Sequence, residues 1–358
     1  MPGIRIRHGV AVEVSRARPG VLEVVVEVDG AKARAIAYED LTGPVAPGDR
    51  LVLNTGAVAL GLGTGGMHFV IAVAGGDDTE PRGEGHAMKL RYTPVQHAVQ
   101  PVEETHAAAI DAFDGLGGKP VVLASLHSGL APMCVAARAM RPGLKIAYVM
   151  TDGGALPLAF SESVAALTAA GLLDTTITVG QAFGGTLEAV NLFSGIVAAF
   201  QVAHADLVVV GAGPGNLGTA SRFGFALMEL GVNVNAVAAL GGRAVVAPRV
   251  SFADARERHH GISHHTITAL ATAALAGSEI ALPSLGPDRR EAIIARLEAA
   301  NLLELHRVVD VPFGEDVEAA LRSSPVPFAS MGRSFDDDPD CFRTAAAAAV
   351  LAVQQGLR

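Results

Sequence analysis

Residues 119–154 have the sequence KPVVLASLHSGLAPMCVAARAMRPGLKIAYVMTDGG, and this stretch decides the fold. Two short and almost continuous apolar runs, at 119–125 and 144–151, flank an Ala- and Leu-rich segment at 131–140. Apolar runs of this length suit strands that are buried on both faces, as the strands of a parallel sheet are. The stretch therefore predicts a β–α–β unit whose two strands are parallel.

The same alternation continues to the end of the chain. Further strand-like runs lie at 174–180, 205–213, 243–251 and 304–311, and 326–330 is an additional candidate. Helical segments lie at 161–170, 185–203, 216–240, 263–276 and 289–301, and the Ala-rich segment 344–357 predicts a closing helix. This order predicts an α/β fold built on a doubly wound, mostly parallel sheet.

The first 75 residues have a different pattern, which predicts a small β-barrel-like domain. Five short runs rich in Val and Ile, at 10–14, 21–28, 32–38, 49–54 and 68–73, are separated by turn-forming residues. The polar stretch at 75–85, GGDDTEPRGEG, follows them and indicates a linker. We therefore expect an all-β domain over residues 1–80 and a Rossmann-like α/β domain with a ligand cleft over residues 86–358.

Composition and charge exclude several classes of protein. Apolar residues make up 50% of the 358 residues and charged residues 18%, which argues against global disorder. A net charge of −9 without a basic stripe predicts that nucleic acid is not a partner. Cys134 and Cys341 cannot build a disulfide framework, and no apolar stretch is uninterrupted enough to span a membrane. We expect a cytoplasmic protein that has no membrane partner.

Polar, glycine-rich sequences follow five of the predicted strands. They lie at 125–129, 151–154, 180–185, 211–219 and 252–260. The carboxyl ends of parallel strands meet at one edge of a sheet, where open α/β sheets bind their ligands. Each loop alone is ordinary, because strand-to-helix turns need Gly and helix caps need Ser, Thr, Asp or Asn. Their coincidence predicts a small-molecule site at this edge.

The loop at 211–219, GAGPGNLGT, has the spacing G-x-G-x-x-G. At the start of a helix, its backbone amides would bind an anion. A dinucleotide site also needs an acidic residue about twenty residues further on, and the sequence there, VNVNAVAALGG, has none. Phosphate or carboxylate binding and a closely packed turn are the alternatives that remain. The predicted anion-binding residues are Gly213, Gly215, Asn216, Gly218, Thr219, Ser125, Ser128 and Arg256.

A histidine-rich segment, FADARERHHGISHHTITAL at 252–270, is the most unusual feature of the chain. It contains His259, His260, His264 and His265, and Ser263 is the expected N-cap of the helix that follows. Three interpretations are open. In the first, the histidines bind a metal together with His127 and Asp152, although no H-E-x-x-H spacing supports this. Alternatively, one of them transfers protons without a metal, or they are cap and surface residues.

The predicted catalytic residues are Asp152, His127, His264 and His265. Asp152 directly follows a strand, where it could act as an acid or base, or form an Asx turn with Gly153. Candidate nucleophiles are Ser125, Ser128 and Cys134, but neither serine has the G-x-S-x-G pattern. Cys134 lies within a predicted helix, so its simplest role is in the core.

Several of these motifs, taken in order, resemble a bacterial family of proteins of unknown function. The resemblance rests on the segments 35–72, 85–96, 125–132, 148–159, 208–224 and 251–270. It covers nearly the whole chain and is specific, because several unrelated motifs occur in the same order. It implies that the β-rich part and the α/β part belong together and that GHAMKLRYTPVQ (85–96) is an ordered joint. It implies no activity.

Three classes of function fit the sequence. The first is an enzyme, a hydrolase or transferase, that acts on a small anionic or phosphorylated metabolite at the carboxyl edge of the sheet. The second is a metabolite-binding or sensor protein without turnover. The third is a structural subunit of an assembly, since Ala-rich helices permit close packing and leave a homo-oligomer open. The sequence specifies neither a cofactor nor a metal.

Overall fold

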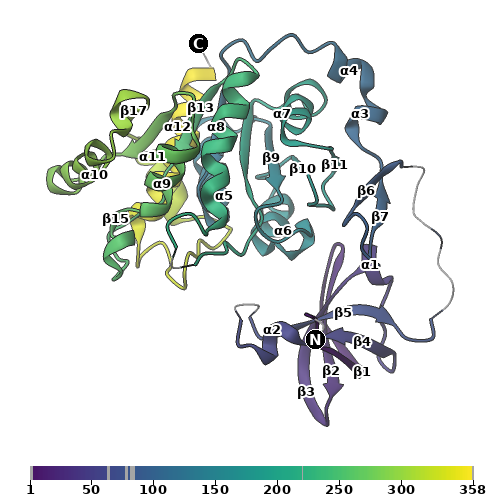
Figure 1. Cartoon of the computed structure of the whole chain (residues 1–358). Coiled ribbons are helices and arrows are strands. Elements are labelled where there is room, and N and C mark those ends of the chain that lie inside the picture. Colours follow the sequence, from purple (N-terminus) through teal and green to yellow (C-terminus); the bar gives the residue numbers. More distant parts are fainter. Residues whose placement is uncertain (1–2, 63–64, 77–79, 81–84, 220, 357–358) are drawn as a thin grey trace. The chain divides into compact units, whose positions relative to one another are not determined.

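The computed structural model describes residues 3–62, 65–76, 80, 85–219 and 221–356. The chain divides into two compact units, Met1–Gln100 and Pro101–Arg358 (Figure 1). The first unit is a closed five-stranded barrel in the order β1-β2-β3-β5-β4, which confirms the expected barrel. Its strands are β1 (Ile6–Arg18), β2 (Val21–Val28), β3 (Ala31–Tyr38), β4 (Arg50–Asn54) and β5 (Met67–Val73), with the short helices α1 (Glu39–Thr42) and α2 (Gly56–Ala59).

Alternation of buried and more exposed side chains along the strands builds the barrel core. In β2, Val24 and Val26 are fully buried, and the residue between them faces the other side. Residues 77–79 and 81–84 of the expected linker lie outside the described residues. Beyond it, β6 (Ala87–Lys89) and β7 (His97–Val99) form an antiparallel hairpin, so 85–96 is ordered. The hairpin lies within the first compact unit, Met1–Gln100.

The second unit is built on an eight-stranded sheet in which all strand pairs are parallel. The strand order is β11-β10-β9-β12-β8-β13-β16-β17. The strands are β8 (Pro120–Ala124), β9 (Ile146–Thr151), β10 (Thr175–Thr178), β11 (Leu187–Glu188), β12 (Leu207–Ala212), β13 (Arg243–Ala247), β16 (Glu279–Pro283) and β17 (Arg307–Val311). A separate two-stranded ribbon pairs β14 (Val250–Ser251) with β15 (Gly261–Ile262).

Helices cover both faces of this sheet, as a doubly wound fold requires. The central strand β12 sends Leu207 and Val209 into one core and Val208 and Val210 into the other. The first core contains α5 (Leu130–Met140), α6 (Glu162–Ala169), α11 (Glu315–Arg322) and α12 (Pro339–Gly356). The second contains α7 (Leu192–Gln201), α8 (Glu229–Ala239), α9 (His264–Ala273) and α10 (Pro287–Ala299), and α3 (Val102–Thr105) and α4 (Ala107–Asp111) precede the sheet. Within the described residues, no helix is both long and apolar enough to cross a membrane.

Four local predictions were wrong. Strand β16 was not predicted. The strand expected at 326–330 is absent from the described structure, where this segment contributes only an isolated bridge between Ser330 and Arg333. The helix expected at 185–203 begins later, after β11, because Asn191 caps α7 by accepting from the amides of Phe193 and Ser194. The helix expected at 216–240 begins only at α8, after a bridge between Gly218 and Phe225.

Candidate functional site

A cavity of about 490 Å³ lies at the carboxyl ends of β8 and β12. Its walls come from residues 124–128, 160–163, 212–216, 226–227, 229 and 329–331. The chain runs from β8 to β9 on one side of β8, and later from β12 to β13 on the other side. This reversal of strand order is the place where open α/β sheets bind ligands. The cavity is therefore where the sequence predicts a ligand site.

His127 projects from the 3₁₀ turn that follows β8, and its ring is held by hydrogen bonds at both nitrogens. Its Nδ1 lies 3.2 Å from the carbonyl oxygen of Ala212, and its Nε2 lies 2.6 Å from Oγ of Ser161. A carbonyl can only accept, so Nδ1 carries the proton and Nε2 accepts the Ser161 hydroxyl proton. Tyr148 Oη, which donates to the same carbonyl at 2.8 Å, lies 3.1 Å from Nδ1.

Burial lowers the pKa of His127 to about 4, and the hydrogen bond to the Ala212 carbonyl opposes this shift only partly. At neutral pH the imidazole is therefore uncharged, with a free lone pair directed at the Ser161 hydroxyl. A hydroxyl whose proton points at a neutral imidazole is the arrangement of an activated nucleophile and its general base.

Ser161 is the N-cap of α6 and is almost completely buried, with 2% of its surface exposed. Its Oγ accepts from the Val164 amide at 3.0 Å while its hydroxyl proton faces His127. Glu162 and Ser163, in the first turn of α6, also line the cavity. Amides in the first turn of a helix have no partner within the helix, so they can donate to an oxygen that gains negative charge.

Other hydroxyl groups line the same cavity. Ser128 donates to Ser330 Oγ at 3.0 Å. Ser125 is buried, with 5% of its surface exposed, and within the described part of the chain its Oγ has no hydrogen-bond partner. A buried hydroxyl without a partner costs about 1–3 kcal/mol, which a ligand that hydrogen-bonds to it would recover.

Glu229, the first residue of α8, places a carboxyl group on the cavity wall. Burial raises its pKa to about 7, a hydrogen bond from Thr151 Oγ1 at 2.8 Å lowers it, and the charge of Asp152 raises it further. Near neutral pH the carboxyl group is therefore present in both its protonated and ionised forms. In one form it can donate a proton and in the other accept one.

The structure brings together half of the residues that we predicted from the sequence. Those that line the cavity are Ser125, His127, Ser128, Gly213, Gly215 and Asn216. The described residues Asp152, Gly218, Thr219, Arg256, His264 and His265 are not part of its wall. Asp152 Oδ2 instead accepts from the Gln181 amide at 2.9 Å, which ties the loop after β9 to the loop after β10. The exposed Arg256 pairs with Asp254 at 2.7 Å.

The glycine-rich loop does not form a helix N-terminus, because α8 begins only at Glu229. Its glycines allow two loops to pack closely: a Cβ on Gly213 would lie 2.4 Å from the Ala155 carbonyl oxygen. The Ala155 amide donates to the Pro214 carbonyl at 2.8 Å. Of the alternatives for this motif, the closely packed turn describes its geometry. Among the described residues that line the cavity there is no Lys or Arg to bind an anion.

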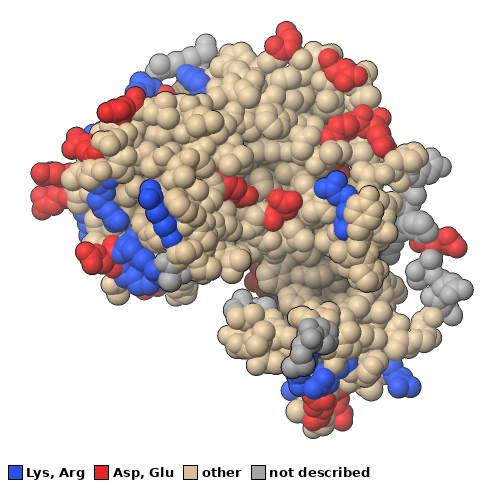
Figure 2. Space-filling model, in the orientation of Figure 1, with Lys and Arg blue, Asp and Glu red and all other residues tan. Residues whose placement is uncertain are grey.

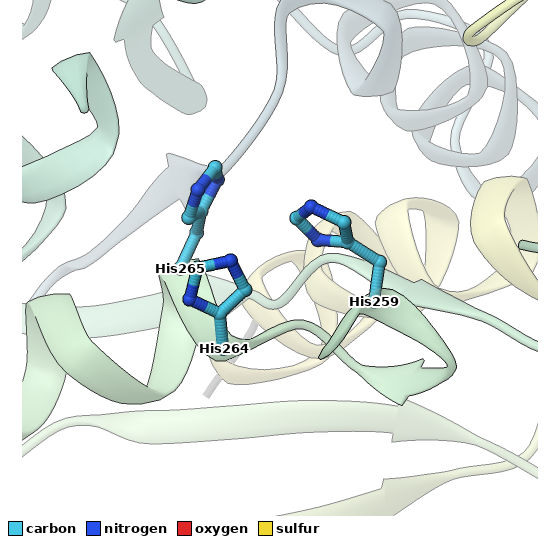
Figure 3. Close-up of side chains that lie close together, drawn as sticks. All are labelled: His259, His264 and His265. Atoms are coloured by element: carbon cyan, nitrogen blue, oxygen red, sulfur yellow. The ribbon is translucent and has the colours of Figure 1, made fainter. Parts of the chain in front are cut away.

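Three of the four histidines in the segment 252–270 come together at a second place (Figure 3). His259 ends a 3₁₀ turn, and His264 and His265 begin α9. One nitrogen from each ring lies within 4.8 Å of the others, so this group could hold a metal ion. His260 is exposed and is not part of this group; its ring lies edge-on to Phe252. The described residues form no such group with His127 or Asp152, so the mixed His/Asp site is not assembled.

Hydrogen bonds and stacking fix two of these rings. Ser263 is the N-cap of α9, as expected, and its Oγ lies 2.8 Å from His259 Nδ1. The ring of His265 stacks on Phe225, with ring centroids 4.1 Å apart. Among the described residues, His264 Nε2 and His265 Nδ1 are buried without a hydrogen-bond partner.

The electrostatic environment keeps the three imidazoles neutral. Burial, followed by nearby arginines and the other histidines, lowers the pKa of His259 to about 3. Burial and the charge of His264 lower that of His265 to about 4, and burial lowers that of His264 as well. Figure 2 shows Lys and Arg side chains over the part of this unit that carries β15 and α10. The exposed Arg256 and Arg258 shortly precede β15 in the chain, and the exposed Arg289 belongs to α10.

Sequence reasoning missed Ser161, Tyr148 and Glu229. It examined the residues directly after each strand, whereas Ser161 and Glu229 reach the cavity from helix starts further along the chain. The N-cap pattern of Ser161 followed by Glu162 was visible in the sequence, but it indicates a helix start and not a base beside the hydroxyl.

Comparison with known proteins gives a family and no activity. The family model described as "Protein of unknown function (DUF3866)" matches residues 34–349. The match confirms the resemblance found in the sequence over nearly the whole chain. No curated protein and no solved structure matches the chain.

Proposed function

The chain belongs to the DUF3866 family of proteins of unknown function, and we propose that it is a hydrolase or transferase of small acyl compounds, with Ser161 as nucleophile and His127 as base. The observation that carries the proposal is the 2.6 Å contact between Ser161 Oγ and the unprotonated Nε2 of His127. The contact lies on the wall of a cavity at the carboxyl edge of the sheet. Such a pair, with its base oriented by a third group, is the common arrangement for covalent catalysis.

In the proposed reaction, Ser161 Oγ forms a bond to the carbonyl carbon of an ester as its proton passes to His127 Nε2. The carbonyl electron pair moves to oxygen, where amides in the first turn of α6 can stabilise the charge. When the carbonyl re-forms, the alcohol leaves and takes the proton from Nε2. Water or a second alcohol then attacks the acyl-serine in the same way, which gives hydrolysis or transfer and restores Ser161.

The third group of this arrangement is the carbonyl of Ala212, which accepts from His127 Nδ1 at 3.2 Å. A carbonyl fixes the tautomer and the orientation of the ring, as a carboxylate does in the Ser-His-Asp triad. It carries only a partial charge, so it stabilises the imidazolium of the transition state less well. We therefore expect a slower enzyme than one with a buried aspartate in this position.

The charges on the cavity wall support an uncharged acyl ester over the phosphorylated metabolite that the sequence suggested. The described wall residues include Glu162 and Glu229 but neither Lys nor Arg. A phosphate would face these carboxyl groups without a counter-charge. An ester or amide needs only hydrogen-bond donors, and the hydroxyl of Ser125, which has no partner among the described residues, is available on the wall. The proposed class of enzyme, a hydrolase or transferase, is the one expected from the sequence, but the proposed substrate is an uncharged acyl compound in place of a phosphorylated metabolite.

Labelling with a fluorophosphonate, which reacts with serines that a neighbouring base activates, tests the proposal. We expect the full chain to be labelled at Ser161, as read by peptide mass spectrometry. Labelling should be lost in Ser161→Ala and His127→Gln. It should persist in Ser163→Ala, a matched control because this serine lies in the same turn and lines the same cavity. Equal labelling of Ser161→Ala, or no labelling of the folded wild-type protein, would overturn the proposal.

The same experiment distinguishes the enzyme from the other two classes of function. Neither a binding protein without turnover nor a structural subunit requires an activated Ser161, so either would leave it unlabelled. The cytoplasmic location and the homo-oligomer stay predictions.

A further inference from the structure

We propose that His259, His264 and His265 form a binding site for a divalent transition metal of the zinc type. The site is distinct from the serine cavity, since none of these described residues lines that cavity. Imidazole nitrogen is a preferred ligand of Zn²⁺ and of neighbouring first-row metals. The proposal rests on two observations: the spacing of the rings and the hydrogen-bonding state of their nitrogens.

The spacing of the rings fits a site that closes by a small movement. One nitrogen from each histidine lies within 4.8 Å of the others. In a tetrahedral zinc site with bonds of 2.0–2.1 Å, ligand nitrogens are about 3.4 Å apart. Small side-chain rotations can provide the remaining closure, because the rings come from two short segments that meet here (Figure 3). Gly261, between those segments, has a φ of +69°, which suits glycine.

The hydrogen-bonding state of the nitrogens also points to a ligand. In the described structure, His264 Nε2 and His265 Nδ1 are buried and have no hydrogen-bond partner. Burying such groups without a partner costs free energy, which coordination of a metal would recover. His259 Nδ1 is already engaged by Ser263 Oγ at 2.8 Å, so Nε2 is its free nitrogen. Metal-binding histidines are typically oriented by such a hydrogen bond at their second nitrogen.

Charged groups also surround the three rings. Nearby arginines repel a cation, but Asp254 offsets part of their charge. Arg249 and Arg256 lie 3.0 and 2.7 Å from its carboxylate. The exposed Arg258 also acts on His264 and His265. With three protein ligands, the fourth position is open to water or to a small anion, which these arginines would attract.

Zinc binding by the full chain tests the site. The protein is stripped with a chelator and titrated with Zn²⁺ in competition with a chromophoric chelator. We expect one equivalent to bind to the wild-type protein. Affinity should fall by more than about 100-fold in His264→Ala and in His265→Gln. For Ser263→Ala we expect the loss of about 10–100-fold that is typical of an outer-shell partner.

His260→Ala is the matched control, because His260 is a neighbour of His259 in the sequence but is not part of the three-histidine group. It should bind Zn²⁺ as tightly as the wild-type protein. Co²⁺ provides a readout that needs no variant: the wild-type protein should develop the visible absorption bands of tetrahedral Co²⁺, and Zn²⁺ should abolish them. Equal affinity in His264→Ala and wild type, or no tight Zn²⁺ and no Co²⁺ bands, would overturn the proposal and leave a neutral ring cluster around Phe225.

The metal site stands independently of the proposed acyl chemistry. Removal of metal should leave fluorophosphonate labelling of Ser161 intact. Loss of labelling in Ser161→Ala with unchanged Zn²⁺ binding would separate the two sites.

Discussion

The pH dependence of Ser161 labelling is the sharpest consequence of the proposed pair. Only neutral His127 can accept the serine proton, so the labelling rate should follow the neutral fraction of this imidazole. Burial lowers the pKa of His127 to about 4. The neutral fraction is then about 0.99 at pH 6, compared with about 0.24 for a histidine with the ordinary pKa of 6.5. Between pH 6 and pH 8 the rate should be flat, whereas an ordinary histidine would give a rise of about fourfold.

Glu229 is a titrating neighbour that could disturb this profile. It lines the same cavity, and its pKa is raised to about 7. The measurement therefore compares wild type and Glu229→Gln, with labelling rates taken from pH 4.5 to pH 8.5. We expect any step near pH 7 in the wild type to disappear in the variant, and the remaining curve to fall only toward pH 4. A rise with an apparent pKa of 6–7 that survives in Glu229→Gln would refute the assignment of a buried, neutral His127 as base.

Three further predictions concern the stability of the fold and the role of Asp152. Folding should weaken as pH falls from 8 to 5, because an unfolded chain protonates histidine near pH 6.5 while the buried His127 stays neutral to about pH 4. This difference in the pKa of His127 amounts to about 2 kcal/mol of unfolding free energy, measured by urea unfolding, and His127→Gln should flatten the slope. Gly213→Ala should lower the free energy of unfolding by about 1–3 kcal/mol, because the new Cβ would lie 2.4 Å from the Ala155 carbonyl oxygen. As a control, Gly143→Ala should lower it by less than about 1 kcal/mol in the same assay, because a Cβ there would have no atom within 4 Å. Asp152→Ala should lower the melting temperature, because it removes the acceptor of the Gln181 amide. Labelling of Ser161 should remain intact in this variant. Loss of labelling in a folded variant would show that Asp152 takes part in catalysis.

The fold was predictable because its central strands are almost entirely apolar. In β8 and β9 all side chains are buried, and such strands appear in the sequence as short continuous runs. Strand β16 is equally well buried apart from its first residue, yet it was missed. Its five residues, EIALP, contain one β-branched side chain and end in proline, so local propensity alone does not identify them. Only pairing with β13 and β17 makes this segment a strand.

The candidate site was predictable only where its residues lie directly beside a strand. His127, Ser125 and Ser128 follow β8 at once, so the rule about carboxyl ends found them. The feature that gives His127 its chemistry could not be found in the same way. It depends on the Ala212 carbonyl and the Ser161 hydroxyl, which come from different strands and loops. A main-chain carbonyl leaves no signature in the sequence, because any residue can supply it.

The two conspicuous motifs of the sequence need different additional evidence before they indicate a ligand. G-x-G-x-x-G implies anion binding only if a helix starts directly after it, because the unpaired amides of that helix bind the anion. Here residues 219–228 lie between the motif and the start of α8. Gly213 instead lets its loop pack closely against the loop that contains Ala155. The histidine pairs, in contrast, lie at the beginning of a helix and in the turn just before it, so the local sequence already places three of the rings near one another. Short-range geometry thus makes the histidine cluster the more reliable sequence signal of the two, although its spacing matches no familiar metal motif.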